Sequence, residues 1–212
     1  MAAGALVLWL VRAGDSIWQR ENRLQGRADI PLSPEGRAAT TNELALHRFA
    51  DDAAEKSLDD PPLDRAAFVH HAPDEGAAET AALVARALGA RTKSSKDLAE
   101  PDLGLLDGLT LELFEERFPT RFRQWEDEPL SLVPPEGEPI ALARERVIAE
   151  FARLLRRPRG RSLGLVLHPM ALGFVRCALS GHPAEDLWQS LEGRPRIERF
   201  VLPGDASERL GA

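Results

Sequence analysis

The stretch that decides the fold is Leu6-Val7-Leu8-Trp9-Leu10-Val11, which leads directly into Arg12-Ala13-Gly14-Asp15-Ser16. A continuous apolar run of this length and strand-like composition is typical of a strand buried on both faces, as in parallel sheets. In such sheets, ligands gather outside the carboxyl ends of the strands. The sequence therefore predicts a buried strand over residues 5–11 and a candidate site at the polar residues that follow it.

Strands and helices alternate along the rest of the chain. Further strands are predicted over 67–71, 163–167 and 196–201, and helices over 34–50, 77–88, 140–155, 169–179 and 184–192, with an amphipathic stretch over 109–118. This order predicts an α/β fold, a three-layer sandwich with a mostly parallel central sheet and helices on both faces. A length of 212 residues suits one sizeable core, so we expect residues 1–212 to form a single domain.

Composition excludes several classes of function. The net charge of −7 argues against a general nucleic-acid binder, which needs a basic face. Basic residues do cluster near the end of the 140–155 helix, where cations complement the helix dipole; they are Arg153, Arg156, Arg157, Arg159 and Arg161. Residues 51–65 are acidic and without periodicity, which predicts a surface loop longer than most connections.

The sequence also bears on membrane insertion, targeting and disulfide formation. The longest apolar runs fall short of the roughly eighteen residues that cross a bilayer, so no membrane span is expected. The N-terminal run lacks a basic leader, which favours a soluble, cytoplasmic protein. Cys177 is the only cysteine, so an internal disulfide is impossible. Its apolar neighbours indicate a buried structural thiol.

A longer motif extends from the first strand. It comprises Trp18, Arg23-Leu24-Gln25-Gly26, Asp29, Pro31-Leu32-Ser33 and Gly36. With Arg12-Ala13-Gly14 it closely resembles the opening of the histidine phosphatase (phosphoglycerate mutase-like) superfamily, whose signature here reads Arg-His-Gly, then an acidic residue and Ser or Thr. The family uses this histidine as the nucleophile that takes up the phosphoryl group. In this chain the position is Ala13, so the resemblance implies the scaffold without its nucleophile.

The resemblance also assigns a phosphate site. Arg12 matches the signature arginine, whose planar donors suit oxyanions. Gly14 would let the chain approach a ligand closely. Gln19 falls where relatives often have Asn, one methylene shorter, and the remaining ligand-binding positions are Gln25 and Gly26.

A second block, Ala72-Pro73-Asp74-Glu75-Gly76-Ala77-Ala78-Glu79-Thr80-Ala81, resembles the family's Ser-Pro-Leu-x-Arg-Ala-x-x-Thr-Ala. The family's arginine, a second phosphate ligand, is replaced by Gly76. Asp74 and Glu75 suit the start of a helix and are explained as caps. Their charges would nevertheless repel a phosphate dianion.

Two later blocks carry the remaining family positions. Glu100 takes the place of the proton donor, a role that requires a raised pKa. His168 keeps the second imidazole, which in relatives contacts the phosphoryl group. Pro169 replaces a glycine and offers no backbone N–H to an oxyanion, although proline is favoured in the first turn of a helix.

Two further histidines, His70 and His71, end the second predicted strand. One of them could enter the cleft as a replacement nucleophile or base. Together with His168 and Glu100 they have the side chains that zinc uses. Adjacent strand residues point to opposite faces, however, so both cannot easily bind one ion, and we expect neither a metal nor a cofactor.

Three interpretations follow from these residues. In the first and favoured one, the chain is a pseudo-phosphatase whose former active-site cleft binds a small phosphorylated molecule or a protein partner. In the second it is an enzyme with altered chemistry, such as a phosphomonoester hydrolase that uses His168 and Glu100. In the third it is an ordinary phosphatase or mutase of the family. Departures at Ala13, Gly76 and Pro169 together favour drift or repurposing over an engineered inactive variant, because a single inactivating change would alter only one position.

An aromatic stripe completes the sequence-level picture. Phe114, Phe118, Phe122 and Trp125 fall at helical spacings, with Pro119 as a break between them. Such a stripe is typical of core or lid packing. If exposed, it would instead indicate a surface for a partner.

Overall fold

The computed structural model describes residues 6–46, 66–156 and 162–209. Within these residues a five-stranded sheet has the order β3-β2-β4-β1-β5. The strands are β1 (Leu6–Arg12), β2 (Phe68–His71), β3 (Arg91–Ser94), β4 (Ser162–Leu167) and β5 (Ile197–Leu202). Four of them run parallel, and β5 pairs antiparallel with β1 at one edge. The predicted α/β class with a mostly parallel sheet is confirmed.

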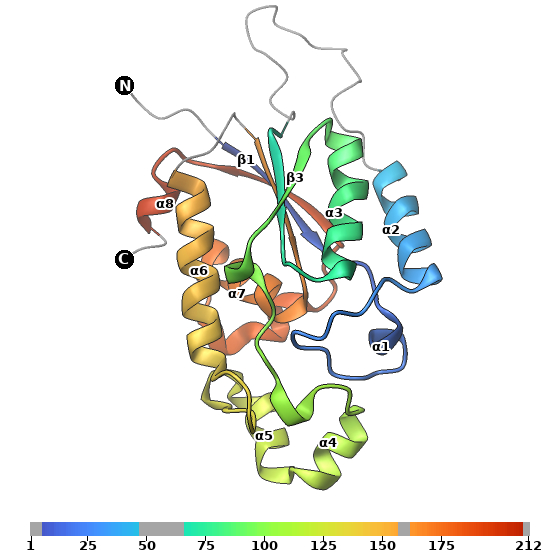
Figure 1. Ribbon diagram of the computed structural model, residues 1–212. Helices are drawn as coiled ribbons and strands as arrows, with labels where there is room; N and C mark the ends of the chain where they lie inside the picture. The colour runs from blue at the N-terminus through green and yellow to red at the C-terminus, as the bar shows by residue number, and fades with distance from the viewer. Residues whose placement is uncertain (1–5, 47–65, 157–161, 210–212) are drawn as a thin grey trace, which may run out of the picture.

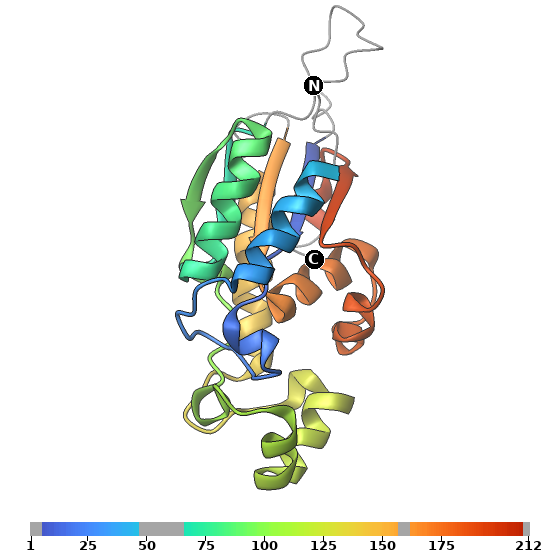
Figure 2. The same ribbon diagram turned by 90° about the vertical axis from the view of Figure 1, so that its right-hand side faces the viewer.

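Helices cover both faces of the sheet (Figures 1 and 2). On one side lie α2 (Pro34–Leu46) and α3 (Glu75–Leu88), and on the other α6 (Ile140–Arg156) and α7 (Pro169–Ser180). Alternate residues of β1 supply the two cores. Val7, Trp9 and Val11 pack with α3, whereas Leu8 and Leu10 pack with α6 and α7. The apolar run is therefore continuous because each of its two faces meets a helical layer.

Shorter elements complete the fold. They are α1 (Ile17–Arg20), η1 (Lys96–Leu98), η2 (Gly104–Leu106), α4 (Leu111–Arg117), α5 (Pro119–Asp127), η3 (Pro129–Ser131), η4 (Ala184–Leu187), η5 (Gln189–Leu191) and α8 (Ala206–Arg209). The pair α4 and α5 projects beyond the carboxyl ends of the strands (Figure 1), and Pro119 separates the two helices as the sequence indicated.

The aromatic stripe packs inward. Phe114 is fully buried, and its ring meets those of Phe122 and Trp125 edge-on, with centroids 5.4 and 6.0 Å apart. Trp125 in turn lies 4.6 Å from the ring of Trp188. These contacts confirm the packing interpretation, and they fix α4 and α5 against the segment after α7.

Some element predictions were wrong or incomplete. The strand β3 was not predicted, because its four residues are exposed and polar at the edge of the sheet. Residues 184–192 were predicted as one helix but form the two 3-10 turns η4 and η5. Helix α3 begins at Glu75 rather than Ala77, because Asp74 caps it. The predicted loop 51–65, the end of the 34–50 helix and the basic positions 157–161 lie outside the described residues.

The structure also bears on the single cysteine and on membrane-spanning helices. Cys177 is buried and unpaired within α7, and burial raises the pKa of its thiol, as for an inert structural cysteine. Among the described residues, no helix is long and apolar enough to cross a membrane.

Candidate functional site

The first and last motifs meet at the carboxyl ends of β1 and β4. Arg12 is level with Leu167 in the parallel register, and the amide of Ala13 donates to the carbonyl of Leu167 over 2.8 Å. His168 follows immediately as the N-cap residue of α7. Hydrogen bonding between the two strands thus brings Arg12, Ala13 and His168 together, as the strand-end rule predicted.

The side chain at the nucleophile position is a buried methyl group. Ala13 is 1% exposed and belongs to the core beneath α3. Its carbonyl accepts a hydrogen bond from Nη1 of Arg196 at 3.1 Å, and Nη2 of the same arginine pairs with Asp15 at 2.6 Å. A methyl group has no lone pair, so this position cannot accept a phosphoryl group. Sequence reasoning missed Arg196, which lies far along the chain and belongs to no motif.

The surviving imidazole is held by an acid. Nε2 of His168 lies 2.8 Å from Oδ1 of Asp74, and the histidine is 2% exposed. Although burial disfavours the charged ring, the hydrogen bond and charge of Asp74 raise the pKa of His168. The same contact lowers the pKa of Asp74 against the opposing effect of burial. The two groups therefore form a largely buried hydrogen-bonded pair in which each favours the charged form of the other.

Oδ1 of Asp74, which contacts His168, also caps a helix. As N-cap of α3 it accepts the amide of Ala77 at 2.8 Å, so the predicted capping role is confirmed. Sequence reasoning missed its bond to His168, because nothing in the local pattern indicates a partner 94 positions away. Gly76, at the position of the family's second arginine, lies in the buried first turn of the same helix.

Glu100 is buried at the start of α7. Its two oxygens accept the amides of Met170 and Ala171 at 2.7 and 3.1 Å, and the residue is 3% exposed. Burial raises its pKa to about 7, against the charge of His168 and the two amide bonds, which lower it. A carboxyl group with this pKa can exchange a proton near neutral pH. The required property of the predicted proton donor is present.

Arg146 fixes the loop that carries Glu100. Its guanidinium donates to the carbonyls of Asp97, Ala99 and Glu100 and forms a two-pronged ion pair with Glu138, with both distances 2.8 Å. The sequence showed Arg146 only as a polar position in a helical pattern. A half-buried guanidinium that satisfies three carbonyl groups explains why this irregular loop keeps one shape.

Arg12 borders a cavity of about 350 Å³, which we call the cleft cavity. Glu100, Arg23, Gln19 and Gln25 also line it, and its apolar wall includes Met170, Leu103, Trp125 and Trp188. Arg12 makes a long contact of 3.5 Å with Asp15. Nε of Arg12 and Nδ1 of His168 are buried with no hydrogen-bond partner among the described residues. The lining of the cleft cavity thus combines charged groups with an aromatic wall.

Two of the predicted ligand positions carry structural bonds. Gly14 packs against α2, where an added Cβ would lie 2.9 Å from Oγ1 of Thr40, and its amide donates to Thr80. Gln19 forms a capping box with Ser16 at the start of α1, with its Oε1 accepting the amide of Ser16 at 3.0 Å. These bonds shape the loop after β1.

Gln25 and Gly26 belong to the same loop. Gln25 accepts a hydrogen bond from the Ser16 hydroxyl and donates to the carbonyl of Ala28. The amide of Gly26 donates to Asp107, and an added Cβ would lie 2.6 Å from the carbonyl oxygen of Pro101. Gly26 borders a separate, adjoining cavity with Asp74 and Glu100.

Neither neighbouring histidine borders the cleft cavity. His70 lines a different cavity with Lys93 and Arg153, and burial lowers its pKa to about 4. Nδ1 of His71 lies 2.6 Å from the carbonyl oxygen of Ala72. Within the described part of the chain, no three His, Cys, Asp or Glu side chains are grouped to hold a metal ion.

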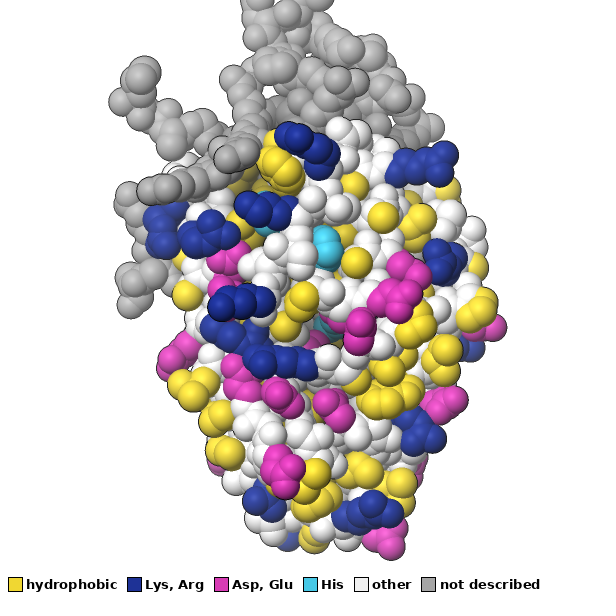
Figure 3. All heavy atoms as spheres, in the orientation of Figure 1, with side chains coloured by type: hydrophobic (Ala, Val, Ile, Leu, Met, Phe, Trp, Pro, Cys, Tyr) yellow, Lys and Arg dark blue, Asp and Glu magenta, His cyan; other side chains and the backbone are white. Residues whose placement is uncertain are grey.

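Basic and acidic side chains are interspersed on the face shown in Figure 3.

The fold and site define a class of protein. An arginine, an imidazole and a protonatable carboxyl group converge at the carboxyl ends of a parallel sheet, in the arrangement expected of a phosphoryl-transfer cleft. The family model of the histidine phosphatase superfamily (branch 1) matches residues 8–194. The chain therefore belongs to the histidine phosphatase superfamily.

Proteins of similar sequence include one named as a mutase and one named as a phosphatase. A probable phosphoglycerate mutase of Salmonella arizonae is 29% identical over 186 residues, 84% of this chain and 77% of that protein. Phosphoserine phosphatase 1 of Hydrogenobacter thermophilus is 26% identical over 181 residues, 85% of this chain and 79% of that protein. The chain thus has both mutase and phosphatase relatives.

Solved structures share the fold. YhfR of Bacillus stearothermophilus superposes with a TM-score of 0.74 at 23% identity, covering 92% of this chain and 90% of the other. The alpha-ribazole phosphatase from Shigella flexneri gives 0.70 at 22% identity, with 87% and 84% covered. At these identities the likeness concerns the fold alone.

Proposed function

We propose that this chain is a pseudo-phosphatase, a member of the superfamily that lacks the phosphohistidine mechanism and acts by binding, with a regulatory role in the cytoplasm. The observation that carries the proposal is the buried methyl group of Ala13 beside a His168 that is already paired with Asp74 at 2.8 Å. The only imidazole that borders the site in the described residues has its Nε2 occupied. For its Nε2 to act as a replacement nucleophile, the 2.8 Å contact with Asp74 would first have to break.

The charges of the cleft support binding without transfer. Asp74 caps the start of α3. In relatives, a second cationic ligand lies two residues further along the chain, at the position of Gly76. A phosphate dianion that enters this cleft therefore meets the negative charge of Asp74 instead. Each lost charge-assisted hydrogen bond weakens binding by about 1.5 to 3 kcal/mol. Such losses would lower the affinity for phosphate by about tenfold or more for each contact.

The cleft cavity favours an acidic small molecule with an apolar part. Arg12 and Arg23 offer guanidinium groups to an acidic group, whether phosphate or another. Trp125 and Trp188 form a wall on which a flat or aliphatic part can pack. Pockets for small molecules combine a mostly apolar lining with a few polar anchors in this way.

A second candidate rests on Glu100. Burial raises its pKa to about 7, so it can serve as a general acid in a phosphomonoester hydrolase that uses water instead of a protein nucleophile. In such an enzyme His168 would stabilise the transferred group. This alternative requires turnover, which separates it from binding alone.

The deciding experiment measures hydrolysis of a panel of phosphomonoesters by the purified protein. The proposal predicts rates equal to the buffer blank for the wild type, Glu100→Gln and His168→Ala. Steady hydrolysis by the wild type that disappears in His168→Ala would overturn the pseudo-phosphatase proposal. If that hydrolysis also falls in Glu100→Gln, the second candidate replaces it.

A further inference from the structure

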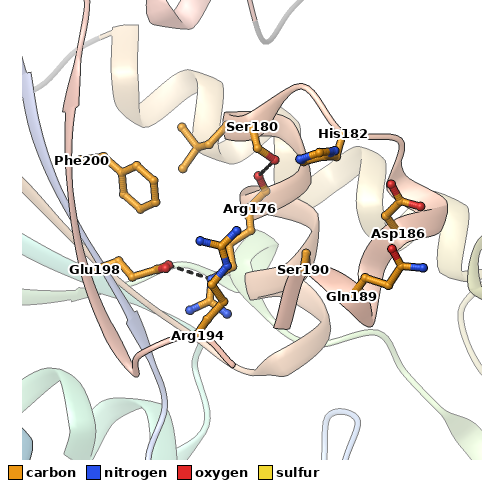
Figure 4. Close-up of a pocket in the computed structure, with 10 residues that line it drawn as sticks. Arg176, Ser180, His182, Asp186, Gln189, Ser190, Arg194, Glu198 and Phe200 are labelled. Carbon is orange, nitrogen blue, oxygen red and sulfur yellow. Dashed lines mark hydrogen bonds and ion pairs between the residues drawn. The ribbon is translucent and has the colours of Figure 1, made fainter. Parts of the chain in front are cut away.

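Two cavities outside the cleft carry charged side chains, and they differ in how those charges are balanced. In the first, at the end of α7, Arg176 is 7% exposed and donates to Glu198 over 2.8 Å, so this buried cation already has its counter-ion (Figure 4). The second, which we call the edge cavity, has a volume of about 220 Å³ and lies where β2, β3, β4 and the end of α6 meet. None of its lining residues borders the cleft cavity.

The register of the sheet places a histidine and a lysine side by side in the edge cavity. His70 of β2 is level with Lys93 of β3, and register partners on neighbouring strands point to the same face of a sheet, about 5 Å apart. Arg153 lines the cavity from α6. Burial, together with the charges of Lys93 and Arg153, lowers the pKa of His70 to about 4 against the opposing charge of Glu150. Both cations are therefore close to the ring.

The buried ring of His70 offers one donor to this cavity. The residue is 8% exposed, and with a pKa of about 4 it is neutral at neutral pH. Its Nδ1 is sealed from solvent and has no hydrogen-bond partner among the described residues. A neutral imidazole has a single N–H, and a buried donor without a partner is costly. The proton therefore belongs on Nε2, which makes no hydrogen bond to a described residue and can donate into the cavity that the ring lines.

The positive charge at the edge cavity is not balanced within the described residues. Glu150 of α6 accepts two bonds from Arg153, at 2.5 and 2.7 Å, and one from the hydroxyl group of Ser95 at 2.7 Å. These bonds leave Nη1 of Arg153 without a partner in the described chain, and Lys93 makes no hydrogen bond or ion pair there. Glu150 therefore offsets the charge of Arg153 and leaves that of Lys93. In Figure 3 basic side chains gather over the end of α6 and the neighbouring edge of the sheet.

We propose that the edge cavity binds a small inorganic oxyanion such as phosphate. The oxygens of the ion accept from Nε2 of His70, from the ammonium group of Lys93 and from Nη1 of Arg153. The volume is below that of ordinary small-molecule pockets, which suits an inorganic ion better than an organic ligand. Leu154 and Leu163 also line the cavity, and an apolar wall strengthens hydrogen bonds to an ion beside it. Because the cavity is separate from the cleft, this site does not depend on the proposed function.

The experiment follows the histidine ring nitrogens of the isotope-labelled full chain by NMR. Inorganic phosphate is added at neutral pH and millimolar concentration, with potassium chloride adjusted to keep the ionic strength constant. The ring of His70 is recognised by its low pKa, about 4. We expect its signals to change saturably with phosphate. Phosphate bound in the cleft would act on the ring of His168 instead, so the two sites are read separately.

A lysine variant and its control locate the site. Lys93→Gln removes a charge without breaking a bond within the described residues, so it should unfold at the wild-type temperature and bind phosphate about fivefold more weakly at His70, as for one exposed ionic contact. Lys96→Gln, at an exposed lysine of η1 outside the cavity, is the matched control and should bind as the wild type does. Absence of a saturable change at His70 in the wild type overturns the proposal. So does an unchanged affinity in Lys93→Gln, or an equal change caused by chloride alone.

Discussion

The two sides of the cleft have diverged to different degrees. On the side formed by β1, β4 and the start of α7, Arg12, His168 and Glu100 occupy the family's positions, and the bonds that orient Glu100 are intact. On the side formed by the start of α3, an acid at Asp74 is bonded to His168 and glycine replaces the second arginine. One side keeps charged residues at the family's positions, and the other sets a carboxylate against one of them.

This difference shows how one residue can serve the fold and bear on the site at once. Asp74 satisfies two donors at once, the α3 amide of Ala77 and the imidazole of His168. A bond that stabilises the folded chain thereby competes with any anion for His168. Ala13 fills core space as its neighbours do. The substitutions are compatible with folding because each makes structural contacts.

The largest expected effect concerns the hydrogen bonds that Arg146 makes around Glu100. Arg146→Met leaves three carbonyl groups and the carboxylate of Glu138 without their main partner, so we expect a loss of about 3–5 kcal/mol in the free energy of unfolding. Denaturant titration measures it. Arg27→Met is the comparison, because Arg27 pairs with the same Glu138 at 2.9 Å and donates to the Glu100 carbonyl only over 3.3 Å, and its side chain is 42% exposed; it should cost less than about 1 kcal/mol. Equal losses would show that Arg146 does not hold the loop.

The next effect is a pH dependence. Burial raises the pKa of Glu100 from 4.5 to about 7, so the folded protein retains a proton that the unfolded chain releases between these values. This contribution to stability is present below pH 4.5 and is lost as the pH rises towards 7. We expect a decrease on the order of 2 kcal/mol over this window.

Glu100→Gln isolates this contribution, because glutamine does not titrate. Stability measured against pH should fall in the wild type relative to this variant over the same window. Profiles that run parallel for the two proteins would mean that folding does not shift the pKa of Glu100, and the general-acid candidate would lose its basis.

A smaller effect tests the other side of the cleft. Asp74→Asn keeps an N-cap residue but removes the charge that faces an incoming anion. We expect the affinity for inorganic phosphate to rise about tenfold, as for one charge-assisted contact. Asp29→Asn is the matched control, since Asp29 also bonds the start of α3, through the amide of Glu75. An equal change in both variants would remove Asp74 from the explanation.

The smallest effect concerns Gln19. Gln19→Ala removes one half of the capping box around Ser16, so the free energy of unfolding should fall by about 0.5–1 kcal/mol. The affinity for phosphate should stay within about twofold of the wild type, because the amide already has a structural bond. A selective loss of phosphate binding without loss of stability would make Gln19 a ligand.

Sequence patterns predicted the core better than the site. The six apolar residues of β1 and the periodicity of α6 follow directly from burial, and both elements form as expected. The edge strand β3 lacks an apolar pattern because solvent covers it. In the site, the motif predicted the positions of Arg12, Glu100 and His168. The bonds of Asp74, Arg146 and Arg196 join distant segments, and such contacts leave no local pattern in a single sequence.

The most direct test of the central claim is a search for a phosphorylated intermediate on the wild-type chain. The protein is incubated with an activated phosphoryl donor such as acetyl phosphate, and its intact mass is measured under conditions that preserve phosphohistidine. We predict an unmodified mass for the wild type and for His168→Ala alike. A wild-type chain that gains one phosphoryl group, with the gain lost in His168→Ala, would contradict the claim that the phosphohistidine mechanism is absent.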